Sequence, residues 1–337
     1  KVILIDPKLR EPIKRSGTLP WTTASLGVLM GHVFRRTSGR AWRLRQRSMA
    51  LWPSWIKELS NPEHPLQLNT PLIQLASCAA EATQMEQLAK QRQHLGLELI
   101  TQNSNPCLGR SWPHTQYGGL LSHQDGYVEP ISLQKCLRTA LQKQEVQQIK
   151  EPVVSIERSS STARTRWRIQ LAGGMNLNND AVVICAALGS EALIEPLGHS
   201  RPMAPVLGQV VDLELLSDQN NWSGWPAVLV SHGINMIPHG TNQLWIGATL
   251  EPGDQPSKCC LKAMQNLEGD APDWLHKAKV IKQWHGLRGR PIERPAPLLE
   301  QLEPGLILAT GHYRNGVLLA PASAEWVKQQ LNCVTTS

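Results

Sequence analysis

The chain has 337 residues, of which 41% are hydrophobic, and a formal net charge of +7. This length exceeds one compact core and predicts two domains of a globular protein. The sequence shows no apolar run as long as a membrane span and no signal peptide. Seven cysteines without Cys-x-x-Cys spacing favour a reducing, cytoplasmic location. The 11 histidines form no His-x-x-x-His pair with nearby acids, so we predict no metal.

The first predicted strand is the apolar run Val2–Ile5, which ends at Asp6 and Pro7. In a dinucleotide-binding unit, an acid after the second strand binds the ribose hydroxyls, about 20 residues after a glycine-rich turn. No Gly-x-Gly-x-x-Gly occurs in the chain, which starts at Lys1. We therefore expect roughly 20–30 residues, one strand and one helix, to precede it in the intact protein. Alone, the run also fits an ordinary core strand with a solvated acid.

A connector with small residues and an amphipathic helix follow. Gly27 and its neighbours would let the backbone approach a ligand closely. Apolar residues such as Trp42 and Trp52 predict a helix over 40–59. The basic cluster comprises Arg35, Arg36, Arg40, Arg43, Arg45 and Arg47. Such a cluster can bind nucleic acid, but we favour a solvated helix face, so a nucleic-acid partner is not expected.

The middle of the chain alternates strands and helices. We predict strands at 71–76, 117–122, 152–157, 167–171 and 181–186, helices at 81–95 and 131–144, and a loop at 103–106. The run at 181–186 is continuously apolar, which predicts burial on both faces. Further strands at 205–214 and 245–249 have no helix between them, and a helix follows at 258–267. This order predicts an antiparallel sheet in a second domain inserted into the first.

Near the C-terminus a buried strand at 306–310 leads into a glycine-punctuated turn, and a helix starts near Pro321. A strand, turn and helix in this order direct free backbone N–H groups toward a ligand. Arg314 lies inside the turn, and Arg288 lies in a second glycine-rich segment. Two arginines beside a helix N-terminus suit an anionic ligand and a flat electron-accepting cofactor. Each arginine alone would more simply tie loops together.

Two motifs carry a family resemblance. The segment Gly311-His312-Tyr313-Arg314-Asn315-Gly316-Val317-Leu318-Leu319-Ala320-Pro321 resembles the C-terminal signature of the FAD-dependent D-amino-acid oxidase superfamily. It is most similar to the glycine-oxidase branch, the imine-forming enzymes of thiamine biosynthesis. Gly286-Leu287-Arg288 matches a second motif of that branch. The resemblance covers nearly the whole chain.

The resemblance implies an α/β fold. An FAD-binding Rossmann-like domain, with its first strand and helix absent, would carry an inserted substrate domain built on an antiparallel sheet. The FAD-binding domain would comprise residues 1–60, 117–200 and 285–337. The substrate domain would comprise residues 61–116 and 201–284.

The resemblance also implies the site residues. FAD would be bound by Asp6, Pro7, Thr22, Leu26, Gly27, Val28, Val153, His312, Tyr313, Arg314, Asn315, Gly316, Val317 and Leu318. Arg288 and Arg314 would bind the substrate carboxylate, and no side chain need act as a base if the substrate binds as a free amine. Asn235 stands where the branch has a tyrosine, and Val28 where it often has methionine. Glycine, sarcosine, a D-amino acid and another secondary amine therefore all remain open.

The implied activity is oxidative deamination of glycine or a similar small amino acid. O2 would be the acceptor, and the products would be an imine or oxo acid, ammonia and H2O2. No membrane partner is expected, and a homo-oligomer remains open. One alternative is an FAD-dependent enzyme that modifies the tRNA wobble uridine. The other is a non-catalytic flavoprotein-like scaffold, which would apply if Lys1 is the native start.

Overall fold

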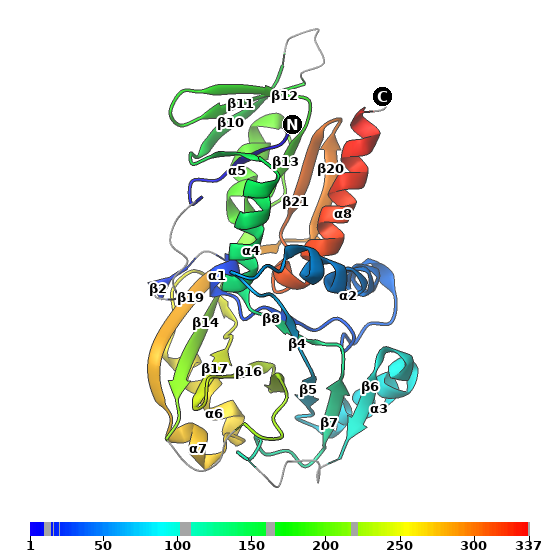
Figure 1. Cartoon of the computed structure of the whole chain (residues 1–337), viewed down its shortest axis with the longest axis vertical. Coiled ribbons are helices and arrows are strands. Elements are labelled where there is room, and N and C mark those ends of the chain that lie inside the picture. Colours follow the sequence, from blue (N-terminus) through cyan, green and yellow to red (C-terminus); the bar gives the residue numbers. More distant parts are fainter. Residues whose placement is uncertain are drawn as a thin grey trace.

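The computed structural model describes residues 1–9, 15, 17–19, 21–101, 109–159, 166–216 and 222–335. The predicted loop at 103–106 and part of the predicted turn between 157 and 167 lie outside these residues. Figure 1 shows two lobes, with both chain ends in the upper one and a large curved sheet in the lower one. In the described part of the chain, no helix is both long and apolar enough to cross a membrane.

The lower lobe is built on a ten-stranded sheet. In spatial order its strands are β2 (Gly17–Thr18), β19 (Lys279–Pro291), β14 (Met203–Glu214), β17 (Gln243–Gly247), β16 (Ile234–His239), β15 (Val228–Ser231), β5 (Leu72–Leu75), β7 (Gly119–Ser122) and β6 (Leu97–Ile100), while β18 (Glu251–Pro252) pairs with β14. Most neighbours are antiparallel, as predicted; β15–β5 and β19–β2 are parallel. The sheet is accompanied by α3 (Ala79–Arg92), α6 (Lys258–Asn266) and α7 (Asp273–His276).

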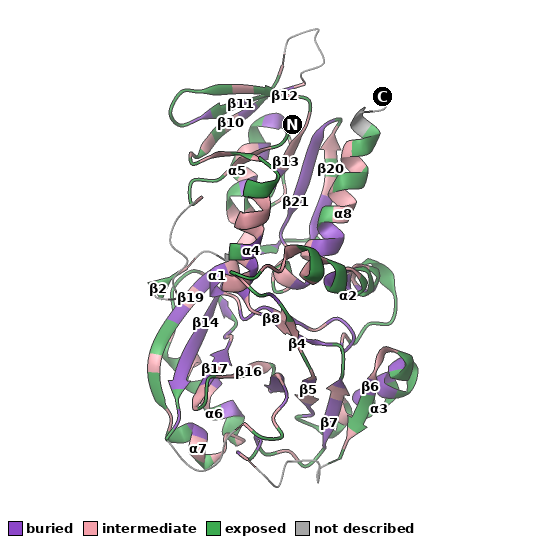
Figure 2. Ribbon diagram, in the orientation of Figure 1, coloured by how far each residue is buried: buried purple, intermediate pink, exposed green. Residues whose placement is uncertain are grey.

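The upper lobe contains short parallel strand pairs. β1 (Ile3–Ile5) is parallel to β9 (Gln147–Ile149), and β13 (Val182–Ile184) is parallel to β21 (Leu306–Thr310). The strand β20 (Leu298–Glu303) runs antiparallel beside β21. Figure 2 shows β21 buried along its length. The predicted strand at 181–186 is shorter than expected, and the prediction of full burial is wrong: only Ile184 of β13 is buried, and Cys185 and Ala186 after the strand are exposed. β13 lies at the edge of its three-stranded sheet.

The remaining elements of the upper lobe include a predicted hairpin and two helices. β10 (Val153–Arg158) pairs antiparallel with β11 (Trp167–Leu171) as predicted, and β12 (Asn176–Asn179) extends this sheet. The helices α4 (Pro130–Lys143) and α5 (Ser190–Ile194) lie nearby (Figure 1). Between the lobes are α1 (Trp21–Ala24) and a small sheet of β3 (Val28–Leu29), β8 (Gly126–Val128) and β4 (Leu68–Asn69).

Two long helices pack together where the lobes meet. These are α2 (Gly39–Leu59), close to its predicted bounds, and α8 (Gly316–Thr335). The helix predicted to start near Pro321 therefore begins five residues earlier. Proline inside a helix removes one N–H donor and disturbs the turn before it. Here α2 compensates: Trp52 Nε1 donates to Leu318 O at 3.1 Å, and Ala322 N donates to Ser48 Oγ at 3.2 Å.

The domain boundaries stay a prediction. One of them, between residues 284 and 285, lies inside a single strand, because β19 runs unbroken from Lys279 to Pro291. That strand pairs with β14 over nearly its full length. The segment around Gly286 and Arg288, expected to return the chain to the cofactor domain, is thus part of the large sheet.

Candidate functional site

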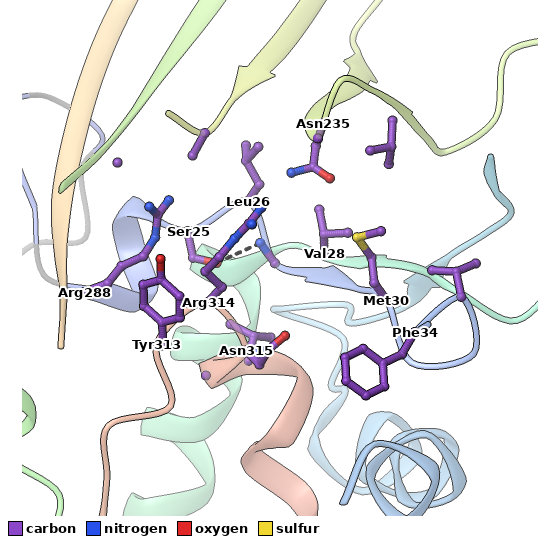
Figure 3. A pocket seen from close by; sticks show the side chains of 18 of the residues that line it. Ser25, Leu26, Val28, Met30, Phe34, Asn235, Arg288, Tyr313, Arg314 and Asn315 are labelled. Carbon is purple, nitrogen blue, oxygen red and sulfur yellow. Dashed lines mark hydrogen bonds between the residues drawn. The ribbon is translucent and has the colours of Figure 1, made fainter. Parts of the chain in front are cut away.

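The two lobes enclose a cavity of about 650 Å3. Its walls come from β16 and β19 of the large sheet, the loop around Gly27, and the start of α8 (Figure 3). Eleven residues predicted for the site line it: Thr22, Leu26, Gly27, Val28, Asn235, Arg288, Tyr313, Arg314, Asn315, Gly316 and Val317. Segments that are far apart in the sequence therefore converge on one cavity.

Arg288 is held by the sheet and stays cationic. Its Nη1 donates to Thr249 O at 3.0 Å, and more weakly to Leu207 O at 3.4 Å. Burial lowers the pKa of Arg288 to about 10, and the positive charge of Arg314 adds to the effect. A pKa near 10 leaves the guanidinium protonated at neutral pH. The other face of the fork remains available for an anion.

Gly208 makes room for this arginine. A β-carbon at Gly208 would lie 2.1 Å from Arg288 Nη2, well inside contact distance. Gly208 is on β14, in the stretch where that strand pairs with β19. Glycine therefore lets the guanidinium lie flat against the neighbouring strand.

Arg314 lies in the turn between β21 and α8. The turn is made by left-handed backbone at Gly311 and Tyr313, with φ of 63° and 55°. Figure 3 shows Arg288, Tyr313 and Arg314 on the same side of the cavity. Arg314 is exposed and, among the described residues, has no carboxylate within ion-pair distance. Two guanidinium groups thus face one part of the cavity without a protein anion between them.

The start of α8 supplies backbone donors. Asn315 precedes the helix, and its carbonyl accepts from Leu319 N at 2.8 Å. The first N–H groups of an α-helix have no partner inside the helix. Gly316 and Val317 carry such groups and line the cavity. This end of the helix favours an anion or a partly negative ring edge.

On the opposite wall, Gly27 allows a close approach. Its φ is 69°, and a β-carbon there would lie 1.9 Å from Val128 O. The carbonyl of Gly27 accepts from Val128 N at 3.0 Å, which ties this loop to β8. Leu26 and Val28 are thereby held at the cavity wall.

Asn235 contributes an acceptor. Its Nδ2 donates to Gly247 O at 3.0 Å, which fixes the amide on β16. Its Oδ1 is buried, and within the described chain it has no hydrogen-bond partner. A buried acceptor without a partner is costly unless a ligand supplies a donor. The amine of a substrate is such a donor.

Five predicted residues lie outside the cavity lining. Asp6 and Pro7 follow β1, where Asp6 N donates to Ile149 O at 3.1 Å. Val153 begins β10, four residues after Ile149, so it lies in the same upper lobe. Leu318 is buried where α8 packs on α2. These four residues therefore lie apart from Arg288 and Arg314.

His312 is the fifth of these residues. Its Nε2 lies 2.8 Å from Ser323 Oγ, so the imidazole joins the turn to α8. Burial lowers the pKa of His312 to about 4, helped by the charge of Arg40. The ring is therefore neutral near pH 7.

The sequence analysis missed several lining residues, among them Met30, Phe34, Gln74 and Val230. It also placed Arg45 on a solvated face, which is wrong: only 8% of Arg45 is exposed. The sequence does contain a signal for the burial of Arg45, because this residue follows Trp42 by three positions and precedes Met49 by four. That spacing puts it on the apolar face of the helix.

The residues present fit FAD. The exposed Asp6 carboxylate, after a parallel strand, suits ribose hydroxyls. The cavity, with its helix N-terminus and a wall that only glycine allows at position 27, suits the flat ring system. The two regions lie in the upper lobe and between the lobes, which is consistent with an extended dinucleotide.

The chain belongs to the FAD dependent oxidoreductase family, which matches residues 16–330. This confirms the resemblance drawn from the two motifs, with FAD as the cofactor. Among similar proteins is a glycine oxidase from Pseudomonas putida, 33% identical over 165 residues, which are 47% of this chain and 42% of that protein. A glycine oxidase from Bacillus subtilis is 26% identical over 212 residues, covering 61% of this chain and 55% of that protein. The chain thus spans less than half the length of the first curated relatives it matches.

Solved structures support the α/β fold with a cofactor and a substrate domain. Glycine oxidase from Geobacillus kaustophilus superposes with a TM-score of 0.77 at 23% identity, covering 94% of this chain and 86% of that one. Iminodiacetate oxidase from Chelativorans superposes with a TM-score of 0.76 at 18% identity, covering 96% and 93%. At these identities the likeness shows the fold alone.

Proposed function

We propose that this protein oxidises glycine or a similar small amino acid, with O2 as the electron acceptor. The products would be an imine, which hydrolyses to an oxo acid and ammonia, and H2O2. The observation that carries this proposal is the pair Arg288 and Arg314, which face one cavity without a carboxylate partner among the described residues. The glycine oxidases among its relatives support the substrate class. A role in thiamine biosynthesis is part of the proposal and follows from the motif resemblance.

The arginines would bind the substrate carboxylate. A guanidinium binds a carboxylate through two parallel hydrogen bonds, which fixes orientation as well as position. Arg288 is already anchored through Nη1 to Thr249 O, so little side-chain freedom is lost on binding. Arg314 adds a second positive charge.

Asn235 would bind the other end of the substrate. Its unpaired Oδ1 accepts from the amine N–H, while its Nδ2 remains bonded to Gly247 O. Two anchors at fixed positions restrict the rotation of a small amino acid and hold its Cα in one place. FAD, when bound, would supply the electron-accepting chemistry.

None of the described residues that line the cavity is Asp, Glu, His or Lys, the side chains that most often act as a base. Five are arginines: Arg35, Arg36, Arg45, Arg288 and Arg314. Their positive charge favours the neutral form of a bound amine. The substrate would therefore react as the free amine, and its ammonium proton would be lost to water.

A substrate panel tests this proposal. FAD-loaded protein is mixed with glycine, sarcosine, D-alanine, D-proline and a bulky amine without a carboxylate, and peroxide is measured. Anaerobic loss of flavin absorbance should accompany each true substrate. The amine without a carboxylate should be inactive. If no carboxylate-bearing amine bleaches fully loaded protein, the oxidase proposal is wrong and tRNA modification becomes the better candidate.

A further inference from the structure

The end of the cavity next to α2 contains a second pair of arginines, Arg36 and Arg45. Arg45 comes from α2, and its guanidinium lies 3.7 Å from the centre of the Phe34 ring. Figure 3 shows Phe34 beside α2, on the far side of the cavity from Arg288. The second arginine pair and the pair Arg288–Arg314 thus lie at different ends of one space.

Arg45 is buried but incompletely bonded. Only 8% of the residue is exposed, and its Nη1 donates to Ala41 O at 3.2 Å. Its Nε is buried, with no hydrogen-bond partner within the described chain. An unsatisfied buried donor on a charged group is expensive. An anion in the cavity would remove that cost.

No carboxylate in the described part of the chain neutralises this pair. Arg35 is paired with Glu81, but no ion pair links Arg36 or Arg45 to an acid among the described residues. The pKa of Arg45 is lowered to about 10, first by burial and then by the charge of Arg36. Arg45 is therefore still a cation at neutral pH, close to a second cation.

The surrounding loop is held in place, so the pair is built into the fold. Asp125 is fully buried and accepts from the backbone N–H groups of Gly31, His32 and Val33 at 2.9–3.0 Å. Arg92 donates to the carbonyl oxygens of Phe34 and Arg36, at 2.6 and 2.7 Å. The backbone of Arg36 is thereby fixed at the cavity edge.

We propose that Arg36 and Arg45 form a second anion subsite, which binds the distal acidic group of the substrate. The substrate would then be an amine with two acidic groups: one held by Arg288 and Arg314, the other by the second arginine pair. Phe34 would cover the intervening apolar part. This subsite proposal rests on the proposed oxidase function. It narrows the substrate class to amines with two acidic groups.

The test compares a diacid with a monoacid on the FAD-loaded protein. We measure kcat/KM for iminodiacetate and for glycine in the wild type, Arg36→Gln, Arg45→Gln and Arg43→Gln. Arg43 is an exposed arginine on the same helix that does not line the cavity, so it controls for the loss of one charge. The ratio of iminodiacetate to glycine efficiency should fall roughly tenfold or more in the first two variants. It should stay unchanged in Arg43→Gln.

A binding measurement separates this proposal from the oxidase function. The Tm of the protein is followed with glutarate and with acetate, neither of which can be oxidised as an amine. Glutarate should raise the Tm more than acetate does, and Arg36→Gln should remove the difference. If no amine is oxidised but glutarate still raises the Tm more than acetate does, the proposed oxidase function is wrong and the subsite proposal is supported.

Two results would overturn the subsite. One is an unchanged iminodiacetate-to-glycine ratio in Arg36→Gln, a substitution at an exposed side chain. The other is loss of bound FAD in both Arg36→Gln and Arg45→Gln, with the kinetic difference explained by that loss alone. The anion would then be the diphosphate of the cofactor and not part of the substrate.

Discussion

At the residue scale, Arg288 is the side chain on which the proposed activity depends. Arg288→Ala removes a bidentate, charge-assisted contact worth about 2–4 kcal/mol in a desolvated site, or roughly 30- to 1,000-fold in kcat/KM. The flavin absorbance spectrum should not change, because the loss concerns the substrate. Lys282→Ala, an exposed change on the same strand, is the control. If Arg288→Ala releases FAD instead, the residue has a structural role.

Gly208 tests the same guanidinium indirectly. In Gly208→Ala the new β-carbon would lie 2.1 Å from Arg288 Nη2, so the arginine must move. We expect KM for glycine to rise while the circular dichroism spectrum stays native. Gly189→Ala, whose β-carbon would lie 3.9 Å from its nearest neighbour, should behave as wild type. Equal kinetics in the two variants would show that the position of Arg288 is not critical.

His312 makes stability depend on pH. Its pKa is about 4 in the folded chain and 6.5 for an ordinary histidine, so the unfolded chain binds more protons between these limits. The stabilisation by neutral His312 is complete above about pH 6.5 and is lost as the pH falls toward 4. The loss is on the order of 3 kcal/mol. Urea unfolding across this range should show a smaller pH slope in His312→Gln, and an identical slope would contradict the prediction.

At the element scale, Asp125 and Arg92 hold the loop between β3 and α2. Asp125→Asn replaces one acceptor oxygen by an NH2 group facing backbone N–H donors. We expect the free energy of unfolding to fall by about 1–3 kcal/mol, because buried N–H donors lose their acceptor. Asp254→Asn, at an exposed site, should change stability by less than about 0.5 kcal/mol. Chemical denaturation measures the free energy of unfolding of both variants. Equal values for Asp125→Asn and Asp254→Asn would show that the loop does not need the carboxylate.

The second element-scale feature is the contact between α2 and α8. Local sequence signals placed the start of α8 at Pro321, because proline favours the first turn of a helix. The structure begins the helix at Gly316, since Ser48 and Trp52 of α2 bond to groups that the proline disturbs. Those partners come from about 270 positions earlier in the chain. No local pattern around Pro321 contains them.

At the scale of the whole molecule, the cavity is assembled from both lobes and carries five arginines and no acid, histidine or lysine among its described lining residues. If no side chain of the protein accepts the proton, the pH dependence of kcat/KM should follow the pKa of the substrate amine. We expect efficiency to rise with pH as the free-amine fraction increases, and the midpoint to shift when amines of different pKa are compared. A midpoint that stays the same for every amine would point to a titrating protein group.

The sequence by itself determined the family and the cofactor, and it named eleven of the residues that line the candidate cavity. The turn at 311–321 and the segment at 286–288 carry local chemistry: left-handed backbone, a helix start and two arginines. Alternating and continuous apolar runs also indicated several of the strands, among them β5, β11, β14 and β21, because burial imposes a period of two on a sheet. These signals are local, so they can be recognised without coordinates.

Only the tertiary structure decided which arginines share a cavity. Arg45 looked like part of a solvated basic face, but the loop at Phe34 folds over it and the large sheet closes the space opposite. Arg288 proved to belong to a long strand, where Gly208 of the neighbouring strand leaves room for it. Such arrangements depend on packing between segments far apart in the chain. Local patterns do not carry that information, because burial of a charge is a property of the assembled fold.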